Sequence, residues 1–301
     1  MKQVCAAAFF VASVLLSGCG GAPPQPARPQ DTVLQRESEA GNLAFTLQRP
    51  SEAAAQYEQA LERAEARDDS GAIGDYGYDL AVADLSANRP KDALAAARMT
   101  RIELARRGVA PFPALILVEA TALYRLGDKE QADSLAAEVE VGNDPSAAAG
   151  AAFLRGLIAD EGGDQARLDA ALSRLAHPAN TEESADAFEL AARRDLRDGQ
   201  FARAESEAAR AADLRRTGLD YRGMARALAV EGQAAEEAGD MAAAADLYIQ
   251  AAQSAAAQGD ASSARPWLRQ ALALANTPTL RQLARQTLAK LDTSEDGPAQ
   301  R

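Results

Sequence analysis

The sequence has a single histidine, His177, and only two cysteines in 301 residues. No pair of histidines exists to hold a metal ion, and no Ser–His or Cys–His catalytic pair can form without this one residue. His177 lies in the segment His177-Pro178-Ala179-Asn180, which separates two predicted helices. We therefore expect a solvated loop histidine, no metal, no cofactor and no enzyme activity.

Aromatic residues are also scarce, at 5% of the sequence, and runs of β-branched residues are missing after residue 33. Hydrophobic residues nevertheless make up 47%, and much of this share is alanine. Alanine is the strongest helix former and has little side chain to bury. The composition therefore predicts an all-α protein whose helices pack closely, without a sheet.

Features of nucleotide and nucleic-acid binding are missing as well. Gly162-Gly163 is not followed by the lysine of a phosphate-binding loop. The net charge of −12 disfavours nucleic acid and anionic lipid surfaces. The arginine clusters, which are interleaved with acidic residues, are interpreted mainly as solvated helix faces: Arg98, Arg101, Arg106 and Arg107; Arg193, Arg194 and Arg197; Arg210, Arg215 and Arg216. We expect neither nucleotide nor nucleic acid as a partner.

Carboxylates are abundant, with 44 Asp and Glu residues. Paired carboxylates can act as general acid and base, so a carboxylate hydrolase stays open as an alternative. The adjacent pairs Asp160-Glu161, Glu182-Glu183 and Glu236-Glu237 fit the polar faces of amphipathic helices. A hydrolase would need a non-helical insertion among the helices, and the sequence contains no recognisable one.

The first residues have the pattern of an export signal. Lys2 precedes a run over residues 4–16 that is apolar apart from Ser13 and is too short to span a bilayer. Leu16-Ser17-Gly18-Cys19 follows, and it resembles the lipobox of bacterial lipoproteins. This resemblance implies a signal peptide over 1–18, cleavage before Cys19, and a lipid on the thiol of Cys19. An ordinary secreted protein with a chance cysteine is the alternative.

Residues 19–33 contain four prolines and two glycines, which favour an extended tether behind the lipidated cysteine. Two or more acyl chains hold a protein stably on its membrane. In Gram-negative lipoproteins, an aspartate after the cysteine retains the protein at the inner membrane, and Gly20 stands there instead. The resemblance thus implies a lipid-anchored protein of the cell envelope, at the outer membrane and facing the periplasm if the source is Gram-negative.

The remainder of the chain has internal repeats. The stretches 52–61 and 241–251 are similar to each other, and each reads as the second helix of a hairpin. The pattern resembles the tetratricopeptide repeat, a unit of about 34 residues with small residues at its eighth, twentieth and twenty-seventh positions and a bulky one at its twenty-fourth. The first and sixth units place these residues there: Gly41, Ala53, Tyr57 and Ala60; Gly232, Ala244, Tyr248 and Ala251.

Turn residues support the same phase. The fifteenth position ends the first helix and needs a residue that tolerates a left-handed conformation. For units that begin at Leu34, Gly74, Pro113, Ala149, Ala185 and Ala225, it is occupied by Gln48, Asn88, Gly127, Gly163, Gly199 and Gly239. Only Gln48 departs from the preference. Asp128, Asp164 and Asp240 are the expected N-caps of second helices, and Pro50 and Pro90 stand in first turns.

The sequence therefore predicts a solenoid, similar to tetratricopeptide-repeat proteins, over residues 34–291. It has about six helical hairpins, followed by capping helices over 261–276 and 279–291. The polar segment 292–301, with Gly297-Pro298, is expected to be a disordered tail.

The resemblance also implies a concave groove lined by first helices. Its apolar positions in the first four units are Phe45, Tyr78, Val82, Leu85, Leu117, Tyr124, Phe153 and Leu157. The last two units instead supply charged residues, among them Asp186, Glu189, Arg193 and Arg226. The alternative is that the apolar residues pack between helices. Ser38 replaces the basic residue that the chaperone-binding subtype needs, so that subtype is not expected.

These observations together predict a membrane-anchored, non-catalytic scaffold that binds protein partners in the cell envelope. Two alternatives stay open. One is binding of peptidoglycan or another glycan, or regulation of a cell-wall enzyme, although the stacking aromatics that a glycan requires are few. The other is the carboxylate hydrolase considered above.

Overall fold

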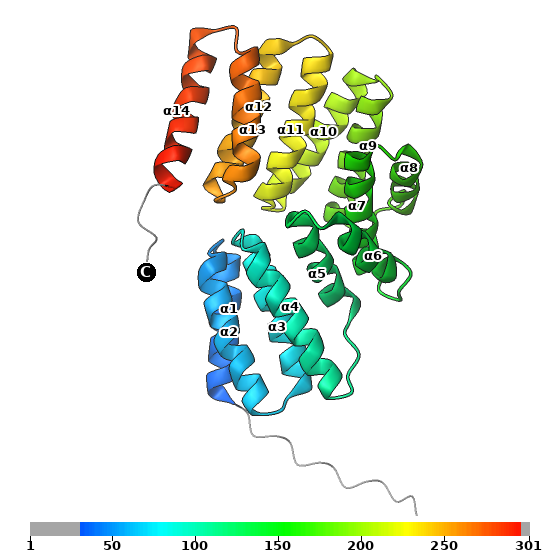
Figure 1. Cartoon of the computed structure of the whole chain (residues 1–301), viewed down its shortest axis with the longest axis vertical. Coiled ribbons are helices and arrows are strands. Elements are labelled where there is room, and N and C mark those ends of the chain that lie inside the picture. The colour runs from blue at the N-terminus through cyan, green and yellow to red at the C-terminus, as the bar shows by residue number, and fades with distance from the viewer. Residues whose placement is uncertain (1–30, 296–301) are drawn as a thin grey trace, which may run out of the picture. The chain divides into compact units, whose positions relative to one another are not determined.

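The computed structural model describes residues 31–295 of the chain, and these contain fourteen α-helices and no strand (Figure 1). The helices are α1 Thr32–Thr46, α2 Pro50–Ala66, α3 Ser70–Ser86, α4 Pro90–Arg106, α5 Pro113–Arg125, α6 Lys129–Glu140, α7 Pro145–Gly162, α8 Gln165–Arg174, α9 Thr181–Arg197, α10 Phe201–Thr217, α11 Tyr221–Glu237, α12 Met241–Ala257, α13 Ala261–Leu274 and α14 Pro278–Glu295. The signal peptide, Cys19 and nearly all of the tether lie outside the described residues.

Consecutive helices form hairpins that stack side by side, from α1–α2 to α11–α12, with α13 and α14 completing the stack (Figure 1). The predicted all-α repeat of six hairpins with C-terminal capping helices is confirmed. The least regular hairpin is α7–α8, because α8 has only ten residues. Its Leu168 stands where the repeat has a small residue, and it is fully buried against Leu157 and Leu190.

The turns within the six hairpins share one backbone conformation. The residue at the fifteenth position has positive φ in every hairpin, between 58° and 90°. Gln48 adopts this conformation too, at φ 58°, although a side chain there costs about 1–2 kcal/mol. The predicted N-caps are confirmed as well, because Asp128, Asp164 and Asp240 each accept a hydrogen bond from a backbone N–H three residues on.

Small residues occupy the contacts between helices. The anchor alanines of the repeats are completely buried: Ala53, Ala60, Ala81, Ala93, Ala120, Ala132, Ala136, Ala192, Ala204, Ala211, Ala244 and Ala251. At Gly41, a Cβ atom would lie 2.6 Å from Cε1 of Tyr57, so the Tyr57 ring fills the space that a side chain would need. Helices approach to about 8–10 Å at such positions, which sets how each hairpin rests on the next.

Both ends of the repeat domain differ slightly from the sequence prediction. α1 begins at Thr32, inside the segment assigned to the tether. α14 continues through Glu295, whereas the sequence placed residues 292–295 in the tail. The ion pair between Arg265 and Asp292 joins the last turns of α14 to α13, which explains the longer helix. Residues 296–301 lie outside the described residues. None of the helices described is long and apolar enough to cross a membrane.

We expect Gly232→Leu to lower the free energy of unfolding by about 1–3 kcal/mol, because the added side chain overpacks a tight contact. A Cβ atom at Gly232 would already lie 3.3 Å from both Leu247 Cβ and Tyr248 Cδ1. Glu237→Gln, an exposed change in the same helix, is the control and should stay within about 0.5 kcal/mol. Urea denaturation measures both, and equal effects would contradict the repeat phase.

Candidate functional site

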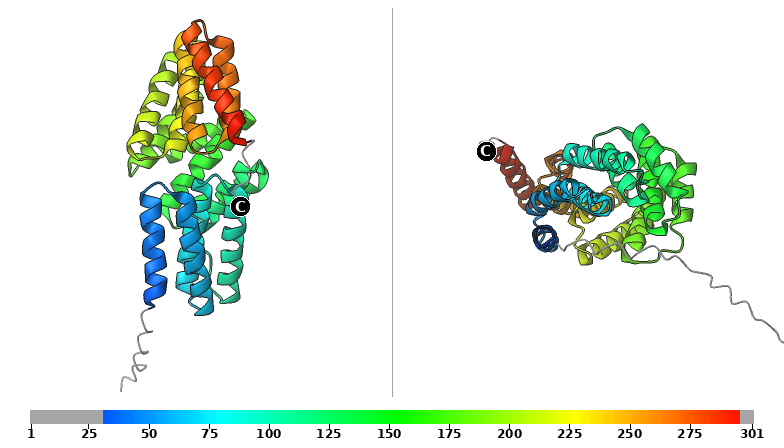
Figure 2. Two further views of the ribbon diagram at one scale, coloured as in Figure 1. Left: turned by 90° about the vertical axis from the view of Figure 1, so that its left-hand side faces the viewer. Right: turned by 90° about the horizontal axis from the view of Figure 1, so that it is seen from below.

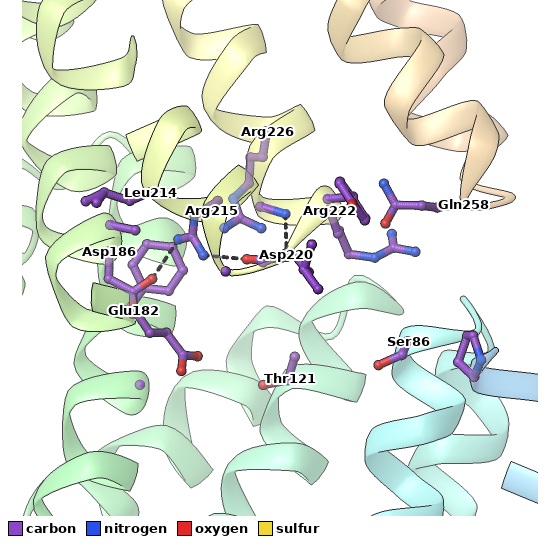
Figure 3. A pocket seen from close by; sticks show the side chains of 18 of the residues that line it. Ser86, Thr121, Glu182, Asp186, Leu214, Arg215, Asp220, Arg222, Arg226 and Gln258 are labelled. Atoms are coloured by element: carbon purple, nitrogen blue, oxygen red, sulfur yellow. Dashed lines mark hydrogen bonds and ion pairs between the residues drawn. The ribbon is translucent and has the colours of Figure 1, made fainter. Parts of the chain in front are cut away.

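A cavity of about 1350 Å³ is the main candidate site (Figure 3). The α1–α2 and α3–α4 turns line one side, through residues such as Gln48 and Ala87. The α10–α11 turn and the end of α12 line the opposite side, and α5, α7 and the start of α9 lie between. All six hairpins thus contribute residues to the cavity, but the helices α4, α6 and α8 contribute none.

One hydrogen bond joins the two sides directly. Asn88, in the α3–α4 turn, donates from Nδ2 to the carbonyl oxygen of Gly259 at 2.9 Å. Gly259 lies in the α12–α13 turn, 171 residues further along the chain. The stack therefore winds far enough for the turn of the second hairpin to meet the turn that follows the sixth, and Figure 2 shows this winding of the helices.

One wall of the cavity is apolar. Of the eight apolar groove residues predicted from the sequence, Phe45, Tyr124, Phe153 and Leu157 line it. Leu117 lies beside them, as the repeat pattern also indicated. The first helices of the first, third and fourth hairpins therefore contribute side chains to a common surface.

The other three predicted groove residues, Tyr78, Val82 and Leu85, are not among those that line this cavity. They pack in the core formed by α3, α4 and α5. Phe112 precedes α5 and meets the ring of Tyr78 edge-on, with the ring centroids 5.7 Å apart. The longer connection between α4 and α5 delivers this phenylalanine, which the repeat pattern does not contain.

The opposite wall carries Arg215, Arg222 and Arg226 (Figure 3), and Arg125 at the end of α5 also lines the cavity. Behind them lies Glu189 of α9, which is completely buried. Arg226 donates to both carboxylate oxygens of Glu189, with Nε at 2.5 Å and Nη2 at 3.0 Å. Nη2 of Arg215 and Nη2 of Arg193 each donate to Glu189 at 3.1 Å. One carboxylate thus positions three arginines from three helices.

This network corrects one sequence interpretation. Arg215 and Arg193 belong to clusters that were expected to be solvated, yet their side chains are only 5% and 15% exposed. Their partners explain the burial, because Arg215 also pairs with Asp186 and Asp220, each at 2.6 Å. In the sequence, charged residues occupy the groove positions of the last two units. This pattern indicated where the charged side chains would gather, but not that they would form buried ion pairs.

The environment shifts the pKa values of two carboxyl groups in the network, Glu189 and Asp186. Burial by itself would raise the pKa of Glu189, but the charges of Arg226, Arg215 and Arg193 outweigh it and hold that pKa well below its usual range. Asp186 behaves differently. Burial raises the pKa of Asp186 to about 7, although the Arg215 charge opposes this. Glu189 is therefore the fixed anion of the network.

Phe153 lies between the two walls. The Cζ atoms of Arg215 and Arg226 lie 5.2 and 5.3 Å from the centroid of its ring. Such cation–π contacts hold guanidinium groups against an aromatic surface without neutralising their charge. The cavity therefore presents apolar and cationic surfaces that are continuous at Phe153.

A second cavity, of about 570 Å³, adjoins the first and shares Tyr124, Arg125, Arg222, Arg226 and Gln258 with it. Trp267 of α13, the only tryptophan in the sequence, lines its far side. Three of the four arginines of the first cavity, Arg125, Arg222 and Arg226, therefore lie where the two spaces meet.

Of the residues considered for enzyme chemistry, Glu182 lines the first cavity and Glu161 the second, and the others lie outside both. His177 is exposed in the loop between α8 and α9. Asp160 pairs with Arg193 and Arg197, and Glu236 accepts a hydrogen bond from the hydroxyl of Tyr248 at 3.0 Å. Residues 31–295 contain no group of three or more His, Cys, Asp or Glu side chains that could hold a metal ion.

Comparison with known proteins relates the chain to repeat proteins through structure alone. No protein-family model matches the sequence, and no curated protein matches it either. A signal-transduction ATPase with a tetratricopeptide repeat sensor, from Pyrococcus horikoshii, matches over 87% of this chain and 44% of its own, with 14% identity and a TM-score of 0.52. A tetratricopeptide repeat protein from Parabacteroides merdae matches over 86% of this chain and its whole length, with 15% identity and a TM-score of 0.49. The fold is therefore that of tetratricopeptide-repeat proteins.

We expect Glu189→Gln to destabilise the protein by about 3–5 kcal/mol, because removal of one partner of a buried ion pair leaves uncompensated charge. Arg226 would lose the only carboxylate within ion-pair distance in the described part of the chain. Glu130→Gln in α6, an exposed position, should change the unfolding free energy by about 0.5 kcal/mol or less. Guanidinium denaturation distinguishes the two, and a Glu189→Gln midpoint equal to that of the control would show that the network contributes little.

Proposed function

We propose that this protein is a non-catalytic scaffold that holds a segment of a partner protein in the large cavity. The observation that carries this proposal is the cavity itself, whose walls come from hairpins distant in the sequence. Its volume of about 1350 Å³ exceeds the range of about 300–1,000 Å³ typical of small-molecule sites. A peptide segment is an occupant of matching size.

The side chains in the walls support a protein partner. Aromatic residues and arginine are the types that contribute most to the free energy of protein interfaces. Phe45, Tyr124 and Phe153 supply rings, and the arginines supply charge and hydrogen-bond donors. The fold itself adds a general argument, since stacked helical repeats create extended concave binding surfaces.

We further propose that the scaffold is anchored in the bacterial cell envelope through lipid on Cys19. The support is the sequence Leu16-Ser17-Gly18-Cys19 after a short apolar run, together with the proline-rich segment that follows. Gly20 in place of aspartate favours the outer membrane, facing the periplasm, if the source is Gram-negative. The scaffold would thus work close to a membrane surface.

Replacement of Thr121 by tryptophan should abolish partner binding. Thr121 lines the cavity at its centre (Figure 3), so the indole would occupy the space proposed for the partner segment. Thr217→Trp is the matched control, because Thr217 is exposed outside the cavity and its hydroxyl makes the same hydrogen bond to the carbonyl four residues earlier. The measurement is affinity capture from crosslinked cells with the natively anchored protein.

Partners recovered equally with both tryptophan variants would place the binding surface outside the cavity. Loss with both variants, accompanied by a lowered melting temperature, would indicate a folding defect. The proposal requires loss with Thr121→Trp alone.

The anchor makes a separate prediction. If the thiol of Cys19 carries the lipid, Cys19→Ala should leave an unprocessed precursor that still contains residues 1–18. Mass spectrometry of the mature N-terminus tests the wild-type protein directly. An unmodified terminus beyond residue 19 would contradict the lipoprotein proposal.

A further inference from the structure

Arg125 differs from the other arginines of the cavity wall in its partners. It ends α5, and its Nη1 donates to the carbonyl oxygen of Leu85 at 2.5 Å. Within residues 31–295, no carboxylate lies within the 4.0 Å of an ion pair to Arg125. Arg215, Arg222 and Arg226 each have at least one. The positive charge of Arg125 is therefore left without a direct counter-charge.

The surroundings of Arg125 make its charged form energetically unfavourable. Burial and the neighbouring charges of Arg222 and Arg226 together lower the pKa of Arg125 to about 9, although the more distant Asp260 and Asp220 oppose this shift. Arg222 has an unmet donor of its own: its Nη1 binds Asp260 at 2.7 Å, while its buried Nη2 has no hydrogen-bond partner. Buried donors are nearly always satisfied, so Arg222 lacks an acceptor and Arg125 lacks a counter-charge, and one anionic ligand group could supply both.

The position of these two arginines indicates how a ligand would run. Arg125 and Arg222 line both the larger and the smaller cavity, so open space lies on either side of them. An acceptor held between them would have room for chain in both directions. A chain terminus would use only one of the two spaces, whereas a side chain in the interior of a segment would use both.

We propose that Arg125 and Arg222 bind the side-chain carboxylate of an internal aspartate or glutamate in an extended partner segment, whose apolar neighbours rest against the wall around Phe45 and Phe153. This inference rests on the proposed function, and it assigns the chemistry that the cavity selects. Arginine binds carboxylates through charge-assisted hydrogen bonds, which are about twice as strong as neutral ones.

The other charges of the cavity favour a carboxylate over a phosphate. Glu182, Asp186 and Asp220 line the same cavity as the arginines. A phosphate group carries about −1.5 to −2 charge at pH 7, so these acidic side chains repel it more than a carboxylate. The net charge of −12 likewise disfavours a strongly anionic segment. A partner segment with a single carboxylate between apolar residues is complementary to both the cationic and the apolar wall.

Binding of short peptides to the full chain in detergent tests this inference. The probes are peptides with acetylated and amidated ends and apolar flanking residues, each made with glutamate, glutamine or phosphoserine at its centre. A fourth version carries the glutamine centre and a free C-terminal carboxylate. Trp267, the only tryptophan, lines the smaller cavity with Arg125, so its fluorescence reports occupancy directly.

We expect the wild-type protein to bind the glutamate peptides at least about tenfold more tightly than the glutamine peptides. Arg125→Gln should remove this preference while binding of the glutamine peptides is kept, and its melting temperature should not fall, since a buried unpaired charge is lost. Arg106→Gln is the matched control, because Arg106 also lies at a helix end but is 71% exposed and outside both cavities. It should keep the preference.

Several results would overturn the inference. Equal binding of glutamate and glutamine peptides by the wild-type protein would do so while leaving the proposed peptide-binding function intact. Tighter binding of phosphoserine peptides, or of peptides with a free C-terminus, would assign the arginines to a different group. If Arg125→Gln weakened all peptides equally, its role would be structural. Failure of every peptide to bind would contradict the proposed function and the inference together.

Discussion

The structure depends on the close contact of helices at residues with almost no side chain. Completely buried alanines, together with Gly41 and Gly232, recur at the contacts within hairpins. Each contact fixes the angle between neighbouring helices, and small rotations add up along the stack. Together these rotations bring Asn88 of the second hairpin into contact with Gly259, in the turn after the sixth hairpin. The cavity between these turns is therefore a consequence of alanine-rich packing far from it.

The cationic wall of that cavity depends on a different constraint. Three arginines from three helices converge on Glu189, which is completely buried and whose pKa is held low by their charges. Arginines this close would repel one another without a common anion. Glu189 thus allows the protein to concentrate positive charge on an otherwise acidic chain. Arg125 lies just beyond this network, where its charge remains available to a ligand.

The local features of the sequence were sufficient to predict the fold. Turn residues, N-caps and small anchors all repeat with the unit, so they predict each hairpin independently of the others; even Gln48 takes the conformation of its equivalents. The site was less predictable. Tyr78 occupies a groove position but packs on Phe112, which lies in a connection outside the repeat pattern. The pairing around Glu189 joins α9, α10 and α11 of two adjacent hairpins, and the contact of Asn88 with Gly259 joins distant ones. A periodic pattern contains no information on which side chains make such contacts.

The cavity exists only because the chain winds until its second hairpin meets the end of its sixth. Crosslinking tests this winding in a chain that carries Asn88→Cys and Gln258→Cys and in which Cys5 and Cys19, the two native cysteines, are replaced by serine. With a short bifunctional maleimide at low protein concentration, we expect an efficient intramolecular crosslink that neither single-cysteine chain forms. Crosslinks that appear only between molecules, or none at all, would contradict it.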